Sequence, residues 1–233
     1  MTIADIGRLL SSDSRVRILS ALMGGQALPA SELAFRAGVS NPTTSEHLKA
    51  LEGADLISGR KCGRHRYYEI KNAEVASSLE TFSVLVGAVD QKRHRAIPER
   101  MVEGRFCYDH LAGRLGVSLT RRLCDCGALE VNGQEYTLAQ ANHPILGRLG
   151  IDSDRLKKER RRLAPQCIDW SERVPHVAGA LGASLARSLT ERGWISRHKD
   201  DRSIVLTDLG KTSLSSELGI IIAIGTATLT NRL

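Results

Sequence analysis

The sequence predicts a mainly α-helical fold with small β-hairpins, an α+β chain in two parts. Aliphatic residues recur at helical spacing along most of the chain, and glycine stops are followed by short β segments. Only 4% of the 233 residues are aromatic, whereas 42% are hydrophobic, so small aliphatic side chains must build the core. We expect a first region at 1–92, a charged boundary containing a proline at 91–100, and a second region at 100–233.

Four helices are predicted at the start of the first region, near 3–10, 13–24, 29–38 and 41–54. Asp13 is the expected N-cap of the second helix, and Gly38 is the expected end of the third. Asn41 followed by Pro42 is a favourable helix start, because proline lacks the N–H that the first turn would leave unpaired.

A β-hairpin and a further helix complete this region. Leu56-Ile57 begins a strand, residues 61–64 form a turn rich in charge and glycine, and residues 66–70 return as a second strand. A helix then runs from Ala73 to about Val89. The order of elements is therefore helix, helix, helix, turn, helix, hairpin, helix.

The second region contains an internal repeat. His110–Leu129 and His176–Ile195 share ten identical residues in twenty aligned positions, where chance gives roughly one. Each copy continues into a short β signal and a closing Leu-Gly-Ile. We expect two winged-helix-like repeats, at about 107–151 and 167–220, each with a helix, a glycine stop, a hairpin and a helix.

Charge and the absence of familiar motifs limit the classes of function. The formal net charge of +7 favours polyanionic partners. The N-terminus has no signal-peptide core, and the apolar run Ile220–Ile224 is too short to span a bilayer, so we expect a cytoplasmic protein with no membrane partner. The chain has no Gly-rich phosphate loop, nucleophile elbow or His-Glu-x-x-His, so we do not expect an enzyme.

The 36–40 segment is a glycine-containing turn of the kind that joins the helices of a helix-turn-helix. The helix after it and the basic hairpin supply groups that bind base edges, phosphates or the minor groove of a double-stranded DNA operator. The candidate DNA-binding residues are Thr43, Thr44, Ser45, His47, Lys49, Arg60, Lys61, Arg64 and Arg66.

Residues 40–70 resemble the ArsR (arsenical-resistance repressor) family of winged-helix regulators. The resemblance rests on Glu46-His47-Leu48-Lys49, Leu56-Ile57, the Gly-Arg and Tyr-Tyr of the hairpin, and Ser14–Leu19, and it covers about residues 4–90. It implies a homodimeric repressor that a small effector releases from its operator, with the first and the 73–90 helices forming the dimer interface.

Two sensor sites of that family are not carried over. The third helix contains Glu32–Arg36 and no cysteine pair, and the 75–89 helix contains no histidine. The second region also makes this chain about 130 residues longer than a short family member.

Candidate effector ligands lie in the second region instead. They are Cys107, Asp109, His110, Cys124, Cys126, Cys167 and His176. Thiolates and imidazoles favour a soft metal or a metalloid ion, and one composite site between the repeats is conceivable. Thiol redox sensing, structural cysteines and an organic-ligand pocket remain open alternatives. So do a constitutive DNA-binding or architectural protein without an effector and, less favoured, a Cys/His-dependent enzyme.

Overall fold

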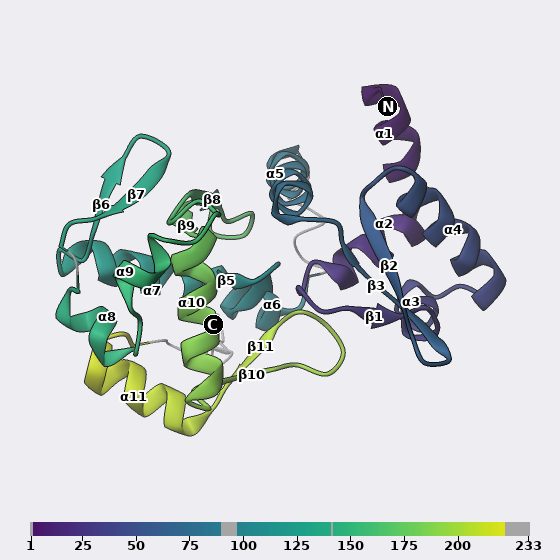
Figure 1. The fold of residues 1–233 in the computed structure, drawn as a ribbon. Helices are drawn as coiled ribbons and strands as arrows, with labels where there is room; N and C mark the ends of the chain where they lie inside the picture. Colours follow the sequence, from purple (N-terminus) through teal and green to yellow (C-terminus); the bar gives the residue numbers. More distant parts are fainter. Residues whose placement is uncertain (1, 90–96, 141, 222–233) are drawn as a thin grey trace, which may run out of the picture.

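The computed structural model describes residues 2–89, 97–140 and 142–221. Figure 1 shows two groups of elements side by side, with the N-terminal helices and their small sheet on one side and the C-terminal hairpins and helices on the other. Helix α5 lies between the two groups. The predicted α+β class is confirmed.

The N-terminal part contains five helices, α1 (Ile3–Leu10), α2 (Asp13–Leu22), α3 (Ala30–Ala37), α4 (Asn41–Gly53) and α5 (Ala73–Val89). The caps of α2 and α4 differ by one residue from the prediction. Ser12 caps α2 by accepting a hydrogen bond from the N–H of Arg15, and Ser40 caps α4 by accepting from Thr43. A serine hydroxyl precedes each predicted cap and reaches the free N–H groups first.

A three-stranded antiparallel sheet completes this part, with β1 (Leu28–Pro29), β2 (Ile57–Cys62) and β3 (His65–Ile70) in the order β1-β3-β2. Ile57 lies opposite Ile70 at the base of the β2–β3 hairpin, and Cys62 lies opposite His65 at its tip. The inward faces of α2 to α4 and the base of this hairpin share one apolar core. The tip therefore projects beyond the core as a wing.

The C-terminal part repeats one order of elements: hairpin, helix, hairpin, helix. The first unit has β4 (Arg105–Cys107), β5 (His110–Ala112), α7 (Gly113–Asp125), β6 (Leu129–Asn132), β7 (Glu135–Leu138) and α8 (Pro144–Arg148). The second unit has β8 (Gln166–Ile168), β9 (Pro175–Val177), α10 (Gly179–Glu191), β10 (Ile195–Arg197), β11 (Ile204–Leu206) and α11 (Asp208–Leu218). Two short helices flank or link them, α6 (Glu99–Glu103) and α9 (Ser153–Leu156).

The hairpin that opens each unit was not expected. The sequence pattern suggested that the helices begin at about His110 and His176, but both residues lie in strands, and the helices begin three residues later at Gly113 and Gly179. Both glycines have φ near +70°, a backbone conformation that favours glycine and separates strand from helix.

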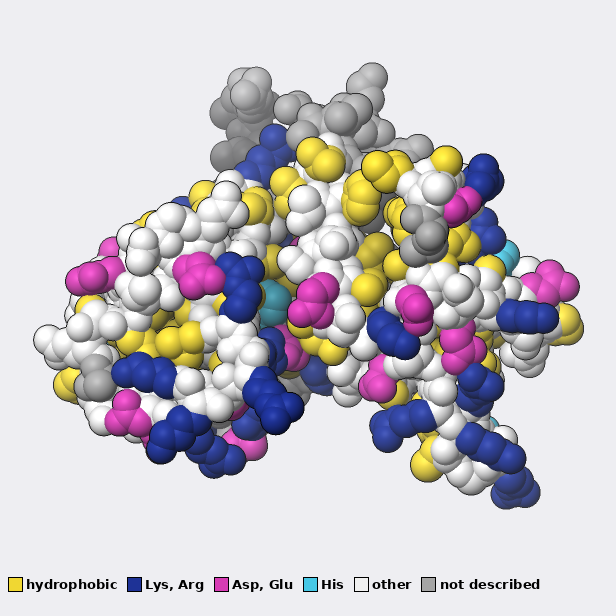
Figure 2. Space-filling model, turned by 45° about the horizontal axis from the view of Figure 1, so that its top comes forward, with side chains coloured by type: hydrophobic (Ala, Val, Ile, Leu, Met, Phe, Trp, Pro, Cys, Tyr) yellow, Lys and Arg dark blue, Asp and Glu magenta, His cyan; other side chains and the backbone are white. Residues whose placement is uncertain are grey.

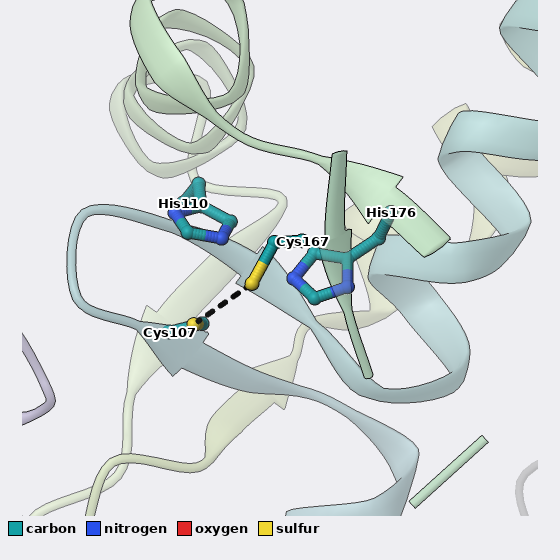
Figure 3. A group of neighbouring side chains, drawn as sticks. All are labelled: Cys107, His110, Cys167 and His176. Carbon is teal, nitrogen blue, oxygen red and sulfur yellow. Dashed lines mark hydrogen bonds between the residues drawn. The ribbon is translucent and has the colours of Figure 1, made fainter. Parts of the chain in front are cut away.

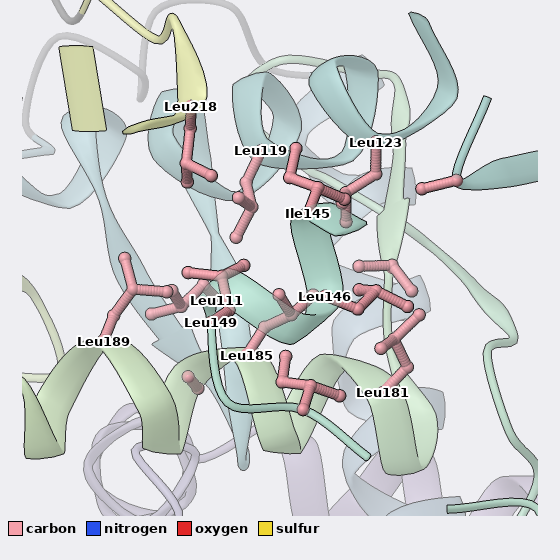
Figure 4. Packing of buried hydrophobic residues seen from close by; sticks show 14 of the residues in the cluster. Leu111, Leu119, Leu123, Ile145, Leu146, Leu149, Leu181, Leu185, Leu189 and Leu218 are labelled. Atoms are coloured by element: carbon pink, nitrogen blue, oxygen red, sulfur yellow. The ribbon is translucent and has the colours of Figure 1, made fainter. Parts of the chain in front are cut away.

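The two units exchange contacts. The N–H of Phe106 donates to the carbonyl of Arg202 in the second unit, and the N–H of Tyr136 in the first unit donates to the carbonyl of Ala164 before β8. Helix α7 also packs on β9, and α10 packs on β5. Figure 4 shows leucines of both units meeting in one apolar core, so neither unit has a core of its own.

Two equivalent glycines allow this close packing. A Cβ at Gly116 would overlap the carbonyl of Leu111, and a Cβ at Gly182 would overlap that of Val177. Each helix therefore approaches the backbone of the strand that precedes it, as only glycine permits.

The predicted boundary at 91–100 is described only from residue 97 onward. Among the described residues, no helix combines the length and apolar character needed to cross a membrane.

Candidate DNA-reading surface and metal centre

Helix α4 presents a polar face at its N-terminal turns. Ser45 and Lys49 are exposed, while Thr43 and His47 are partly exposed. Ser45 also bonds back to the carbonyl of Asn41, at 3.0 Å. These polar side chains lie near the N-terminus of the helix, where contact with phosphates and base edges is favourable.

Thr44 is a correction to the expected set. Its side chain is fully buried, and its hydroxyl donates to the carbonyl of Ser40 at 2.9 Å. It lies on the face of α4 that also carries buried Leu48 and Leu51. Thr44 therefore packs the helix against the core and does not reach DNA.

Three exposed residues near the tip of the wing, Arg60, Lys61 and Arg64, are cationic, and we call them the wing cations. Figure 2 shows Lys and Arg side chains gathered on the projecting hairpin. Gly63 forms the tip with φ +60° and no neighbour near its Cβ position. The tip is therefore free to enter a groove or lie along a phosphate backbone.

Arg66 has a different environment from the wing cations. Its guanidinium donates to Glu52 at 2.6 Å and lies 5.5 Å from the centre of the Tyr68 ring. Glu52 also accepts from the N–H of Gly59 in the wing. Arg66 therefore joins the end of α4 to the base of the wing.

A second cluster lies in the C-terminal part, where Cys107, His110, Cys167 and His176 come together. Their ligand atoms all lie within 4.8 Å of one another, and theirs is the one such group found among the described residues. Figure 3 shows the two sulfur atoms and the two imidazole rings facing a common centre. Three of the four side chains are buried, and Cys167 is partly buried.

Strand register produces this cluster. Cys107 lies directly opposite His110 in the β4–β5 hairpin, and Cys167 lies directly opposite His176 in the β8–β9 hairpin. Because paired residues point to the same face of a hairpin, each hairpin supplies one sulfur and one nitrogen donor. Strands β5 and β9 lie side by side and bring the two pairs together.

The geometry suits a tetrahedral metal ion. Cys107 Sγ and Cys167 Sγ are 3.9 Å apart, and a tetrahedron with Zn–S bonds of about 2.3 Å has an S–S edge of about 3.8 Å. The two imidazole rings stack with their centres 5.1 Å apart. Both ring nitrogens of His176 are buried and have no hydrogen-bond partner among the described residues. Two sulfur and two nitrogen donors match the S₂N₂ sets that bind zinc.

Carboxylates support this cluster from outside it. Asp109 lies 3.5 Å from His110 Nδ1 and accepts a hydrogen bond from Arg161 at 2.6 Å, so it orients the ring and is not among the four converging ligands. Asp169 accepts from Arg105 at 3.0 Å and from the N–H of Gly113 at 2.5 Å. Its pKa lies well below the usual range, because the Arg105 charge and these hydrogen bonds outweigh burial.

Burial and neighbouring side chains together set the protonation of the cluster. Burial lowers the pKa of His110, but the Cys107 sulfur and the Asp109 carboxylate outweigh it and raise that pKa to about 9. The hydrogen bond to Cys167, together with burial, raises the pKa of the Cys107 thiol well above its ordinary value. Burial, with the neighbouring His110 ring, lowers the pKa of His176 to about 3. His176 is therefore neutral, the form that ligates metals.

Cys124 and Cys126 do not join the cluster, which corrects the expectation that they are ligands. Both are partly buried against the apolar core at the end of α7, and the Cys126 thiol donates to the carbonyl of Leu123. The Cys-x-Cys spacing places them at a helix end and far from either hairpin pair.

Comparisons with known proteins agree with the N-terminal architecture. A family model described as a helix-turn-helix domain matches residues 10–60. The HTH-type transcriptional regulator YdfF of Bacillus subtilis is 37% identical over 220 residues, which cover 94% of this chain and 97% of YdfF. The HTH-type transcriptional regulator CmtR of Mycobacterium tuberculosis is 32% identical over 102 residues, 44% of this chain and 85% of CmtR.

A solved winged helix-turn-helix domain of a possible ArsR-family regulator from Mycobacterium bovis is also similar. It is 27% identical and covers 36% of this chain and 77% of that domain, with a TM-score of 0.34.

The fold and its exposed basic elements define a winged helix-turn-helix protein that binds DNA. The chain belongs to the ArsR family of transcriptional regulators, as the resemblance of residues 40–70 implied.

Sequence reasoning missed the buried charges that surround the cluster. Arg105, Asp169 and Glu80 are all fully or almost fully buried, and Arg202 pairs with Glu80 at 3.3 Å. Glu80 is the one charged residue between Val75 and Val89, and this isolation is a local signal that could have identified it. Its partners are more than twenty residues away along the chain, so no periodicity could identify them.

Proposed function

We propose that this regulator responds to a thiophilic divalent cation, Zn²⁺ or Cd²⁺, held by Cys107, His110, Cys167 and His176. The observation that carries the proposal is the convergence of two Cys–His pairs from separate hairpins onto one centre. Ion binding would displace the protons of the two thiols and of His110, and the resulting two thiolates and two neutral imidazoles would give a tetrahedral site with no net charge around a divalent ion. A trivalent metalloid that prefers three thiolates finds only two here.

We further propose that the protein is a homodimeric repressor. Apolar side chains are exposed on the two helices that the family resemblance assigns to the dimer interface. They are Ile3 on α1 and Phe82 and Leu85 on α5, with exposed fractions of 93%, 48% and 58%. Burial of such a patch against a second copy is favourable, and a two-fold dimer would read two half-sites one helical turn apart or a multiple of it.

Ser45, His47 and Thr43 would read bases, and Lys49 with the wing cations would bind phosphates or the minor groove. Arg66 would hold the wing in position against α4. In this scheme, cation binding in the C-terminal part lowers the affinity of the dimer for its operator.

Thiol oxidation is the second candidate, because the two sulfur atoms are only 3.9 Å apart. A peroxide could remove two electrons and two protons from the thiols, forming a disulfide and water. Cys107 is buried, which limits the access of a peroxide, and oxidation assigns no role to the two histidines, so the metal is the stronger candidate.

The test uses the full chain purified under reducing, metal-free conditions. Co²⁺ is added as a spectroscopic probe, and affinity for a duplex selected from a randomised library is measured by fluorescence anisotropy with and without Zn²⁺. We expect one Co²⁺ per chain, with the visible absorption of a tetrahedral thiolate complex, and at least tenfold weaker DNA binding with Zn²⁺.

Cys107→Ser and His176→Ala should abolish both effects, whereas the matched double variant Cys124→Ser, Cys126→Ser should retain them. Loss of DNA binding on peroxide treatment, with no response to metal and no effect of His176→Ala, would favour the redox candidate instead.

A further inference from the structure

The hairpin that carries Cys107 and His110 also touches the DNA-binding part. Its two-residue turn, Tyr108-Asp109, meets the C-terminal end of α2. The N–H of Tyr108 donates to the carbonyl of Met23 at 2.7 Å, and the Tyr108 side chain packs against the apolar core of the N-terminal part. The turn therefore connects Cys107 to His110 and also contacts the end of α2.

The fit at this contact is tight. Tyr108 has φ +60°, a conformation that costs a tyrosine energy and persists only where its surroundings impose it. Gly25, with φ +70°, lies against the carbonyl of Tyr108, and a Cβ at this position would overlap that carbonyl. Next to it, the guanidinium of Arg197 donates to the carbonyl of Gly24 at 2.6 Å. The Tyr108-Asp109 turn therefore fits closely against Met23 and Gly25 at the end of α2, and we call this contact surface the seat.

The second hairpin is also tied to the DNA-binding part, through buried charges. Glu80 on α5 pairs with Arg202 at 3.3 Å and lies 4.0 Å from Arg105. Arg105 pairs in turn with Asp169 at 3.0 Å, two residues beyond Cys167. All four charges have buried side chains, so moving one of them without the others would leave a buried charge unpaired, which is costly.

We infer that the Tyr108-Asp109 turn, seated on Gly25 and the end of α2, transmits metal occupancy to the DNA-reading helix. The inference rests on the proposed function, because it assigns a route to the response proposed there. A cation bound by both hairpins would fix the position of the β4–β5 hairpin relative to the β8–β9 hairpin. It would therefore change the position of the Tyr108-Asp109 turn against the end of α2. Helix α2 packs directly on α4, so a shift of α2 moves the reading face.

In a two-fold dimer such a shift changes the distance and angle between the two reading helices. Because the DNA fixes the spacing of the half-sites, a small rotation of each α4 prevents the two reading faces from meeting both half-sites at once, which reduces affinity. The Glu80 network on α5 would move in the same event, since both hairpins hold the same ion.

Gly25→Ala tests the route, because its methyl group would fill the seat while touching no metal ligand. Gly127→Ala is the matched control, since Gly127 has a similar φ of +74° and open space around its Cβ position. Each variant is titrated with Co²⁺ and assayed for DNA affinity with and without Zn²⁺. We expect Gly25→Ala to bind Co²⁺ with the wild-type spectrum but to change its DNA affinity less than twofold with Zn²⁺, whereas Gly127→Ala keeps the response of at least tenfold.

Tyr108→Gly provides an independent perturbation in case Gly25→Ala does not fold. Glycine adopts φ +60° freely, so the turn persists, but the contact of the ring with the N-terminal core is lost. We expect its response to Zn²⁺ to fall at least threefold. A full response in both variants, or in the one that folds, would overturn the inference and leave the proposed function intact. A wild-type protein that binds no Co²⁺, or whose DNA affinity ignores Zn²⁺, would instead contradict the proposed function.

Discussion

Replacement of His176 by leucine should have opposite effects on the metal-free and the metal-bound protein. The His176 ring is fully buried, and neither of its nitrogens has a hydrogen-bond partner among the described residues. A buried polar group without a partner costs about 1–3 kcal/mol, and a neutral imidazole contains two such groups. Leucine is apolar and similar in size, so it removes this cost together with the ligand.

The magnitude follows from these two groups. Removal of two unpaired nitrogens should stabilise the metal-free protein by about 2–6 kcal/mol. The different shape of leucine should destabilise its packing by up to about 1.5 kcal/mol. The metal-free variant should therefore be more stable than the metal-free wild type by about 0.5–6 kcal/mol. At a free Zn²⁺ concentration of one hundred times Kd, the wild type gains about 2.7 kcal/mol, a gain that the variant should lack.

The assay is urea unfolding followed by tryptophan fluorescence, with EDTA and with Zn²⁺. Both tryptophans, Trp170 and Trp194, are buried in the C-terminal part, so the signal reports the part that contains the cluster. A variant that is less stable than the wild type in EDTA, and that Zn²⁺ stabilises as much as it does the wild type, would refute the reasoning. In that case His176 would be a packing residue only.

Three further predictions concern DNA binding and packing. Alanine at the three wing cations should reduce the slope of log affinity against log salt by about 0.9 for each lost phosphate contact, so by about 5 in a dimer with two wings, measured by anisotropy between low and moderate salt. His47→Ala should relax sequence preference in selection from a randomised duplex library, whereas Thr44→Val should leave the preference unchanged and lower stability by about 1 kcal/mol. Gly116→Ala should destabilise the C-terminal part by about 1–3 kcal/mol in urea unfolding, because its methyl group meets the backbone of the preceding strand, whereas Gly147→Ala, with open space around it, should not. Equal unfolding midpoints for these two glycine variants would show that α7 does not need its close approach.

The helices of the N-terminal part could be predicted because their signals are local. Capping serines, Pro42 and the left-handed Gly38 lie within a few residues of the ends that they define. The opening hairpins of the two units could not be predicted. Each strand has three residues, and the Tyr108-Asp109 turn lacks the glycine typical of tight hairpin turns. These strands pair within their own hairpins and pack against the helix of the other unit, a contact that no local pattern reveals.

The metal cluster could be predicted only in part for the same reason. The sequence suggested a composite site between the repeats, but it offered seven candidate ligands and no means of choosing among them. Cross-strand pairing makes the choice, with two residues between Cys107 and His110 and eight between Cys167 and His176. The two spacings differ because the loops of the two hairpins differ in length. The four strands have equal lengths, so both Cys–His pairs still reach one centre.

The pairing of one cysteine and one histidine within each unit has a consequence for how the protein would respond at different concentrations. Either hairpin alone offers half of a coordination sphere, and two separate copies of one unit would have to associate before they could bind an ion. Joining both halves in one polypeptide makes that encounter intramolecular, so ion affinity no longer depends on the amount of protein. The proposed dimerisation through α1 and α5 would still depend on the amount of protein. A change in the level of this regulator would therefore alter operator occupancy without altering the intrinsic affinity of each chain for the ion.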